Sequence, residues 1–495
     1  MSAVIYDVAV IGAGIVGLAV ARRLSRYNLR MAILEKEPDV AMGSTKANSA
    51  IVHGGYAESS AKLKGRLCYK GRAQYKKLDG ELHFGFKEMG SLVFTATDDD
   101  LPKLRALYEN GLRNGLDDLE IVGRERALWI EPNLNPNVRH ALYCRGAGIC
   151  SPYEMAIALA ENAVKNGADL YLDAPVTGIT HREHVFTLQT PKGAFRSRYV
   201  INCAGLHAAE VSRMAAPTEF EIQPRTGEYI LLARGSGKLL NTVVFQMPTP
   251  MGKGILVTPT VHGNLLLGPD AINEPGAYST STHVERLAEI YVHALHTTDK
   301  INLNQFIRSF AGVRATATGD DFIIGESETK GFIQAAGIQS PGLTSSPAIA
   351  DRIVEILADA GLDLVEKTGY DPCRAPLIEV DKKMRPLKEA EELVALPEGV
   401  ERLVCRCEQV AEGTILDAMR RGIPVQTVDA VKRRVRAGMG YCQGQFCRPR
   451  VAALMERELG HPVSPLTDTE RCGAKRVTKQ ELLEYVRDMG GKATF

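Results

Sequence analysis

The start of the chain holds the pattern that most restricts its fold: a strand, a glycine-rich turn, a helix and a second strand that ends on an acid. Gly12, Gly14 and Gly17 form the pattern Gly-x-Gly-x-x-Gly directly after the apolar run 8–11, and the second strand ends at Glu35. The first glycine permits a tight turn, the second lets a pyrophosphate approach, and the third lets the helix pack closely. The pattern predicts a Rossmann-like α/β domain that binds a dinucleotide at the helix N-terminus, with Glu35 on a ribose 2′-hydroxyl.

Late in the chain, cysteines form a Cys-x-Cys pair at Cys405 and Cys407 and a Cys-x4-Cys pair at Cys442 and Cys447. Four thiolates are the usual protein ligands of an iron–sulfur cluster, because soft sulfur suits iron. A structural zinc site is the main alternative, but zinc ligands usually come as Cys-x2–4-Cys pairs. Free thiols are the other alternative. The spacing favours a [2Fe–2S] cluster, which passes one electron at a time.

The residues around these cysteines are consistent with a cluster. A short helix is expected at 412–421, and Gly438, Gly440 and Gly444 would let backbone N–H groups approach the sulfurs. A basic run lies between the two pairs and has three interpretations: it offsets the cluster charge, it docks an acidic electron carrier, or it is a solvated helix face. The run comprises Lys432, Arg433, Arg434 and Arg436.

The composition of the 495-residue chain excludes several classes of protein. Its 60 lysines and arginines nearly balance 59 aspartates and glutamates, so no nucleic-acid partner is expected. No apolar run reaches the roughly eighteen residues of a transmembrane helix. The remaining cysteines show no paired pattern, which favours a reducing, cytoplasmic compartment.

Three further segments carry a resemblance to a known family. The first is 43–55, which ends in His-Gly-Gly. The second is 199–205, where a strand enters a turn of small residues, and the third is 337–346, which precedes a helix. With the N-terminal turn, they resemble the FAD-binding motifs of the D-amino-acid-oxidase superfamily, in family order. Residues 404–447 resemble the bacterioferritin-associated-ferredoxin-like [2Fe–2S] domain. Nearly the whole chain resembles the catalytic subunits of anaerobic FAD-dependent glycerol-3-phosphate dehydrogenases, and segments at 53–68, 224–229 and 311–314 are also similar to L-2-hydroxyglutarate dehydrogenases.

The resemblance implies that FAD is the dinucleotide and that a [2Fe–2S] cluster is the second cofactor. The implied FAD contacts fall in the turn, at the end of the second strand and in the three further segments, apart from Val176, which lies outside them. They are Gly12, Ala13, Gly14, Ile15, Val16, Gly17, Glu35, Lys36, Ser44, Thr45, Asn48, Ser49, Val176, Ala204, Gly205, Gly342, Leu343 and Thr344.

His53 is the candidate catalytic base, because it follows the second flavin motif directly and the resemblance places the matching histidine beside the flavin ring. An unperturbed imidazole titrates near pH 6.5, which suits proton abstraction at neutral pH. Two alternatives remain open: a histidine that only hydrogen-bonds the flavin, and one that attaches it covalently.

Arg314 is the candidate anion clamp, because a guanidinium binds a carboxylate or phosphate in a fork and keeps its charge. The resemblance places it beside the flavin. The alternative is a structural ion pair with Asp320 or Asp321, and Arg225 and Tyr229 are weaker candidates for substrate contacts.

One departure from the glycerol-3-phosphate branch puts the substrate in question. That branch usually has an arginine shortly after the His-x-Gly motif, whereas residues 53–58 contain none. Lys62, Lys64 and Arg66 follow and could substitute. The sequence does not separate a phosphate from a carboxylate substrate.

The expected architecture is α/β and discontinuous: a Rossmann-like FAD-binding domain with an inserted antiparallel β-sheet substrate domain, and a small, mainly helical [2Fe–2S] domain. Residues 1–79, 146–213 and 311–365 are assigned to the FAD-binding domain, and 80–145 and 214–310 to the substrate domain. Residues 366–400 read as a linker, and 401–495 as the [2Fe–2S] domain and C-terminal tail.

Three functions are compatible with these features. The first is a dehydrogenase that transfers hydride from a small anionic hydroxy substrate, foremost sn-glycerol 3-phosphate, to FAD and passes electrons through the cluster to a partner. A 2-hydroxy acid or an amino acid is the alternative substrate. The second is a peroxide-forming oxidase with a structural cluster, and the third a non-catalytic electron-transfer subunit. The expected partner is an electron-accepting flavoprotein or a membrane-associated subunit, which would hold the cytoplasmic chain at the inner face of the membrane.

Overall fold

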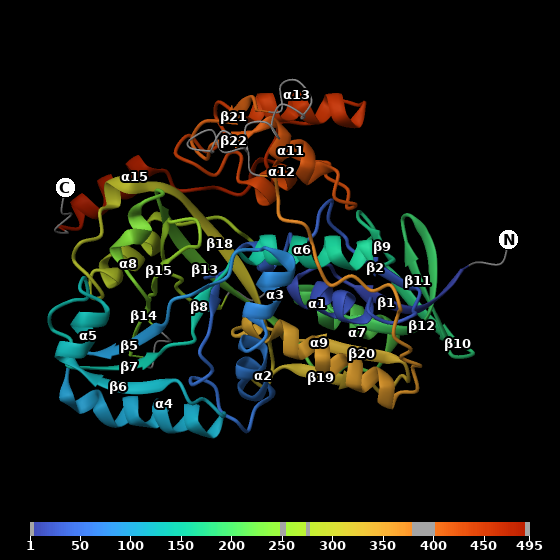
Figure 1. Ribbon diagram of the computed structural model, residues 1–495, viewed down its shortest axis with the longest axis horizontal. Helices are drawn as coiled ribbons and strands as arrows, with labels where there is room; N and C mark the ends of the chain where they lie inside the picture. The colour runs from blue at the N-terminus through green and yellow to red at the C-terminus, as the bar shows by residue number, and fades with distance from the viewer. Residues whose placement is uncertain (1–3, 248–253, 274–277, 379–400, 491–495) are drawn as a thin grey trace. The chain divides into compact units, whose positions relative to one another are not determined.

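The computed structural model describes residues 4–247, 254–273, 278–378 and 401–490 (Figure 1). The chain forms two compact units. The larger one runs to Pro372 and resumes at Lys475, and the smaller one is Cys373–Ala474. Each unit has its own buried apolar core.

A largely parallel sheet carries the nucleotide motif of the larger unit. Its order is β10 (Gly178–Arg182), β11 (Val185–Thr190), β12 (Gly193–Asn202), β1 (Ile5–Ile11), β2 (Met31–Leu34) and β9 (Ala168–Tyr171). β20 (Phe332–Ala336) pairs with β12 and with β19 (Ile323–Glu326). The central strands are buried apolar runs, as expected for a sheet covered by helices. The covering helices are α1 (Ile15–Leu24), α6 (Pro152–Lys165), α7 (Ala208–Ala215) and α9 (Gly342–Asp359).

A second, mainly antiparallel sheet lies in the same unit. Its order is β17 (Ile272–Asn273), β13 (Ile222–Leu232), β16 (Leu265–Leu267), β15 (Val257–Pro259), β14 (Val243–Gln246), β5 (Ser91–Thr95), β7 (His140–Cys144) and β6 (Leu119–Gly123), and β18 (Phe306–Ala317) pairs with β13. Around it lie α4 (Leu101–Arg113), α5 (Arg124–Ile130), α8 (Val284–Ala294) and α15 (Lys479–Asp488).

A small sheet and two helices complete the larger unit. They are β3 (Ile51–Val52), β8 (Gly148–Ile149), β4 (Lys87–Glu88), α2 (Leu63–Arg72) and α3 (Tyr75–Leu82). The smaller unit consists of β21 (Leu403–Cys405), β22 (Val410–Ala411), α11 (Glu412–Met419), α12 (Val428–Val435), α13 (Arg448–Leu459) and α14 (Asp468–Arg471). Two locally patterned elements agree with the sequence expectations: the second strand, and the helix expected at 412–421, which spans Glu412–Met419.

Several expected boundaries differ from the structure, among them the one at 213/214, which falls inside α7. The boundary at 311 cuts β18, because this strand runs from Phe306 to Ala317 and pairs along its length with β13. The segment after 474 returns to the larger unit, where Val477, Leu482 and Val486 pack in the core of the second sheet. The last two differences arise from long-range pairing, which no local pattern encodes. Of the expected linker, residues 379–400 lie outside the described residues. Asp371 belongs to its described part, and its carbonyl accepts a hydrogen bond from Asn162 of α6 at 3.0 Å.

The C-terminal helix α15 therefore stabilises the larger unit, although in the sequence it follows the whole of the smaller unit. Leu482 and Val486, one helical turn apart, are 0% and 1% exposed. We expect Leu482→Ala to lower the free energy of unfolding of the larger unit by about 2–5 kcal/mol, because it leaves a cavity in that core. Chemical denaturation followed by flavin fluorescence measures this. Gln480→Ala, on the outer face of the helix, is the control, and equal stability of the two variants would contradict the packing role.

Candidate functional site

The glycine-rich turn leaves no room for a Cβ at Gly12 or at Gly17. Gly12 has φ of +100°, and a Cβ there would lie 2.5 Å from the carbonyl oxygen of Cys203. A Cβ on Gly17 would lie 2.0 Å from the carbonyl oxygen of Gly12. Gly14 is the N-cap of α1, so the turn leads directly into a helix N-terminus, the kind of position that suits a phosphate.

Glu35 lies at the end of β2, buried beside this turn. Its carboxylate accepts hydrogen bonds from the backbone N–H of Ala13 at 2.6 Å and of Glu37 at 3.0 Å. Burial raises the pKa of Glu35, although these two N–H groups favour its charged form. Lys36 is exposed, and its ammonium pairs with Glu37 rather than with the turn.

The second flavin motif ties the turn to the second sheet. The Ile15 N–H donates to Thr45 Oγ1 at 3.0 Å, and Asn48 Nδ2 donates to the Thr45 carbonyl at 2.9 Å. Ser44 Oγ donates to the carbonyl of Val313 in β18 at 2.6 Å. Ser49 Oγ lies 3.3 Å from the Tyr229 hydroxyl of β13. The residues proposed for FAD therefore border the β13–β18 face.

The other proposed cofactor residues converge on the same region. Val176 and Ala204 pack against one apolar cluster, and Gly205 follows Cys203, whose carbonyl lies against Gly12. Gly342 begins α9. Hydrogen bonds fix the next two residues: the Tyr75 hydroxyl donates to the carbonyl of Leu343 at 2.5 Å, and the His53 N–H donates to Thr344 Oγ1 at 2.9 Å. Val16 lies buried in the first turn of α1.

His53 lies between the start of α9 and the second sheet. Its Nε2 is 3.5 Å from Ser340 Oγ, and its ring centroid is 5.9 Å from that of Phe245 in β14. Ser340 belongs to the 337–346 motif, so its position carried a signal that the sequence analysis did not use. No local pattern marked Phe245, because it reaches the histidine through sheet pairing.

Arg314 is not in the structural ion pair that the sequence left open. Its Nη2 donates to the carbonyl of Asp270 at 3.3 Å, while Asp320 binds Lys62 at 2.7 Å and Lys64 at 2.8 Å. Hydrogen bonds from the two lysines lower the pKa of Asp320 to about 2. Asp321 accepts from the backbone N–H of Leu63 and of Lys64 at the start of α2.

The cations expected to replace the missing family arginine are engaged elsewhere. The buried ammonium of Lys64 also binds Glu58 at 3.1 Å, so two carboxylates offset its charge. Lys62 shares Asp320, and Arg66 donates to the carbonyl of Ala61 at 3.3 Å. Arg314 is thus better placed to hold an anion than Lys62 and Lys64, whose charges are offset by carboxylates.

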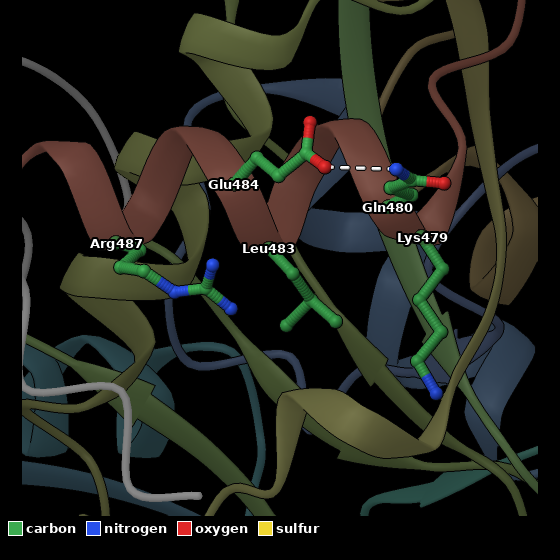
Figure 2. A pocket seen from close by; sticks show the side chains of 5 residues that line it. All are labelled: Lys479, Gln480, Leu483, Glu484 and Arg487. Atoms are coloured by element: carbon green, nitrogen blue, oxygen red, sulfur yellow. Dashed lines mark hydrogen bonds between the residues drawn. The ribbon is translucent and has the colours of Figure 1, made fainter.

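A surface hollow of about 310 Å³ lies along α15, and none of the residues described above lines it (Figure 2). All of its lining side chains come from this single helix, and Gln480 donates to Glu484 at 2.8 Å within it. Substrate sites gather polar groups from several elements. The hollow is therefore not the active site.

In the smaller unit, the four predicted ligands form two sulfur pairs. The Sγ atoms of Cys407 and Cys442 are 3.7 Å apart, and Cys405 lies within hydrogen-bond reach of Cys447. Each pair thus joins one cysteine of the Cys-x-Cys motif to one of the Cys-x4-Cys motif. In the described part of the chain, no set of three or more cysteine, histidine or acidic side chains converges on one ion. Two separate pairs fit a cluster with two irons better than a single zinc ion.

Hydrogen bonds around the sulfurs favour the thiolate form of one cysteine in each pair, while the pKa of its partner, Cys447 or Cys407, is raised. A hydrogen bond from the Cys447 thiol, aided by the N–H groups of Gly438 and Glu408, lowers the pKa of Cys405 to about 6. Burial opposes ionisation of Cys442, but N–H groups of Phe446 and Gly444 lower its pKa. A Cβ on Gly440 would lie 2.3 Å from Cys407 Cβ, so this glycine provides room for the ligand loop.

The basic run between the pairs is largely internal. Arg433 and Arg434 are buried, and Arg433 binds Asp468 at 2.6 Å. Arg436 binds Glu408 at 3.0 Å, next to Cys407, and Lys432 lies 3.5 Å from Asp429. The run is therefore neither a solvated helix face nor an open docking patch, because carboxylates offset most of its charge.

The arrangement defines a class: a flavin-dependent oxidoreductase with a cluster-binding unit. Residues 7–356 match the family described as FAD dependent oxidoreductase, and residues 403–457 match the BFD-like [2Fe-2S] binding domain. The chain belongs to this FAD-dependent oxidoreductase family, and its cofactors are FAD and a [2Fe–2S] cluster.

Individual relatives agree with this assignment. The chain is 45% identical to a glycerol 3-phosphate dehydrogenase of Caloramator mitchellensis, over 92% of this chain and 95% of the relative. It is 29% identical to the human mitochondrial L-2-hydroxyglutarate dehydrogenase, over 54% of this chain and 61% of the relative. The FAD-bound L-α-glycerophosphate oxidase of Mycoplasma pneumoniae superposes with a TM-score of 0.71 at 27% identity, over 76% of this chain and all of that one. The chain is an FAD-dependent dehydrogenase.

Among the described residues, no helix combines the length and apolar character that crossing a bilayer requires.

Proposed function

We propose that this dehydrogenase oxidises sn-glycerol 3-phosphate to dihydroxyacetone phosphate. The observation that carries the proposal is Arg314, whose guanidinium lies on the sheet face that borders the flavin motif and is not neutralised by Asp320 or Asp321. The names of the Caloramator and Mycoplasma relatives support the same substrate.

FAD, when bound, accepts a hydride from the carbinol carbon. His53 would accept the hydroxyl proton at Nε2, the atom that Ser340 Oγ approaches. The bond from the His53 N–H to Thr344 fixes the backbone beside the start of α9, so the imidazole is held where the flavin motif and the β13–β18 face meet. Arg314 would bind the phosphate and so orient the carbinol toward the histidine.

We further propose that electrons leave through the [2Fe–2S] cluster to a protein acceptor, an electron-accepting flavoprotein or a membrane-associated subunit. The cluster unit supports this, because a flavin that reduces oxygen directly needs no one-electron relay. The M. pneumoniae oxidase aligns over its whole length but covers only 76% of this chain. A peroxide-forming oxidase with a structural cluster is therefore the weaker function.

The test is anaerobic reduction of the purified holoprotein by a panel of substrates. We expect sn-glycerol 3-phosphate to bleach the flavin at a kcat/KM at least about tenfold above that for L-2-hydroxyglutarate, because each 1.4 kcal/mol of differential binding gives tenfold selectivity. The L-2-hydroxyglutarate, glycerate and amino-acid arms serve as comparisons. Preferential bleaching by L-2-hydroxyglutarate would replace the proposed substrate, and bleaching by none would remove the assignment.

A further inference from the structure

Two arginines face each other on the sheet that borders the flavin motif. In the antiparallel pair β13–β18, Arg225 is the direct partner of Arg314. Directly opposed residues project from the same face, a few ångströms apart, and like charges in that position destabilise a sheet. The pair therefore costs stability unless an anion binds to it.

The Arg225 side chain has unused hydrogen-bonding capacity. It is half-buried, and its Nε atom is fully enclosed without a hydrogen-bond partner among the described residues. A buried donor left unsatisfied costs roughly 1–3 kcal/mol, more when the group is charged. An anion bound at the solvent-accessible part of the two arginine side chains would offset both charges and the cost of this enclosed donor.

The sheet face orients the pair relative to the flavin motif. Arg314 leans along β13, because a Cβ on Gly227 would lie 2.7 Å from its Nη2. Gly227 pairs with Gly312, and a Cβ on Gly312 would lie 1.9 Å from the carbonyl oxygen of Ala47. Tyr229 is the next residue of β13 on this face, and its hydroxyl contacts Ser49. The order along the face is thus Arg225 and Arg314 first, then the segment 47–49. An anion on the arginines would be the end of the substrate remote from that segment.

The loop after β16 fixes one edge of the pair. Asp270 accepts from Arg314 through its carbonyl oxygen, while its carboxylate binds Arg286 Nε at 2.6 Å and the Glu228 N–H at 2.7 Å. Asp270 therefore holds Arg314 through a neutral carbonyl group and directs its negative charge to other partners. The charge of Arg314 stays available to a ligand.

We propose that Arg225 and Arg314 together form a subsite for a dianionic phosphate monoester. This inference rests on the proposed function and extends it. One guanidinium satisfies a carboxylate through two parallel hydrogen bonds. A phosphate monoester has three terminal oxygens and a charge of about −1.5 to −2 at pH 7, so it matches two opposed guanidinium groups. Arg225 is thus the residue that selects phosphate over carboxylate.

The test is Arg225→Gln in the holoprotein. We expect KM for sn-glycerol 3-phosphate to rise about 10- to 100-fold with little change in kcat, because a charged hydrogen bond far from the reacting carbon is lost. With neutral glycerol as the substrate, kcat/KM should equal that of the wild type. Arg225→Lys should recover part of the affinity, since it restores the charge but not the fork. Arg234→Gln, exposed just beyond β13, is the matched control.

The outcomes separate this inference from the proposed substrate. An unchanged KM in Arg225→Gln, or an equal loss with glycerol, would overturn the arginine pair even if sn-glycerol 3-phosphate is the substrate. If the wild type does not oxidise sn-glycerol 3-phosphate, the pair is tested by inorganic phosphate. Phosphate should then perturb the flavin absorbance of the wild type and of Arg234→Gln at concentrations at least about tenfold below those needed for Arg225→Gln. Equal phosphate affinity in all three proteins would overturn it.

Discussion

Replacing His53 with Asn is expected to leave FAD bound and to slow flavin reduction about 10²–10⁴-fold, the usual contribution of a general base. FAD should remain because the glycine-rich turn, Glu35 and Thr45, which border the nucleotide site, do not depend on the imidazole. The rate should fall because Nε2, which lies 3.5 Å from Ser340 Oγ, is the proposed acceptor of the hydroxyl proton. Anaerobic stopped-flow absorbance of the flavin measures this rate.

The controls for His53 distinguish a base from a spacer. His184→Asn makes the same replacement in the exposed turn between β10 and β11 and should reduce at the wild-type rate. Ser340→Ala removes a neighbour of the imidazole and should have a smaller effect than His53→Asn. An unchanged rate in His53→Asn would end the role as base. Flavin that stays attached to acid-denatured wild-type protein would reveal a covalent link instead.

The sequence predicts the locally encoded parts of the fold and misses those that depend on long-range pairing. The β1–α1–β2 unit follows from glycines and apolar runs, and its bounds match the expectation closely. The boundary at 311 fails because the length of β18 is decided by its pairing with β13, about ninety residues earlier in the chain. The return of α15 to the second sheet depends on the burial of Leu482 and Val486 against α8, which its amphipathic pattern alone does not assign to a partner.

The candidate site shows the same division. His53, Arg314 and the four cysteines were found from motifs, because each motif is a short string of adjacent residues. The opposition of Arg225 and Arg314 is a property of register between two strands, so no single segment carries it. The neutralisation of Lys64 is likewise invisible in the sequence, since Glu58 and Asp320 reach it from two separate loops. Sequence motifs therefore identify the chemistry, while the structure identifies which charges are free to act on a substrate.

The cluster unit shows how the two kinds of information combine. The spacing predicts the four ligands, and the structure adds that these cysteines pair between the motifs, Cys405 with Cys447 and Cys407 with Cys442. Cys405 and Cys447 are buried, whereas Cys407 is exposed and Cys442 partly so. One edge of the cluster would therefore lie nearer to solvent than the other. Loss of a ligand on the exposed edge gives the most direct test of electron exit.

Replacing Cys442 with Ser is expected to abolish or cripple the cluster, because it removes one of the two thiols of the Cys407–Cys442 pair. The wild type should contain about two irons per chain, since each [2Fe–2S] cluster takes four thiolates, and the variant should lose most of them. A single-turnover reduction of the flavin by substrate should still occur, because hydride transfer uses groups of the larger unit. Steady turnover with a two-electron dye should survive, whereas turnover with the natural protein acceptor should stop. Iron analysis, absorbance spectra and the two turnover assays measure these effects.

Cys472→Ser is the matched control for this variant. Cys472 is exposed in the same unit, and its thiol donates to the carbonyl of Thr469 at 3.4 Å, so its loss should leave iron content and turnover unchanged. Cys442→Ser separates the relay from a structural cluster by a single comparison of acceptors. If the variant loses its iron yet reduces the natural acceptor at the wild-type rate, electrons do not leave through the cluster. If turnover with the dye and turnover with the protein acceptor both stop while substrate still reduces the flavin, the mutation affects more than electron transfer to the protein acceptor. That result would contradict a specific role of the cluster in electron exit. Only selective loss of turnover with the protein acceptor supports a path in which hydride transfer to the flavin would be followed by one-electron transfer through the cluster.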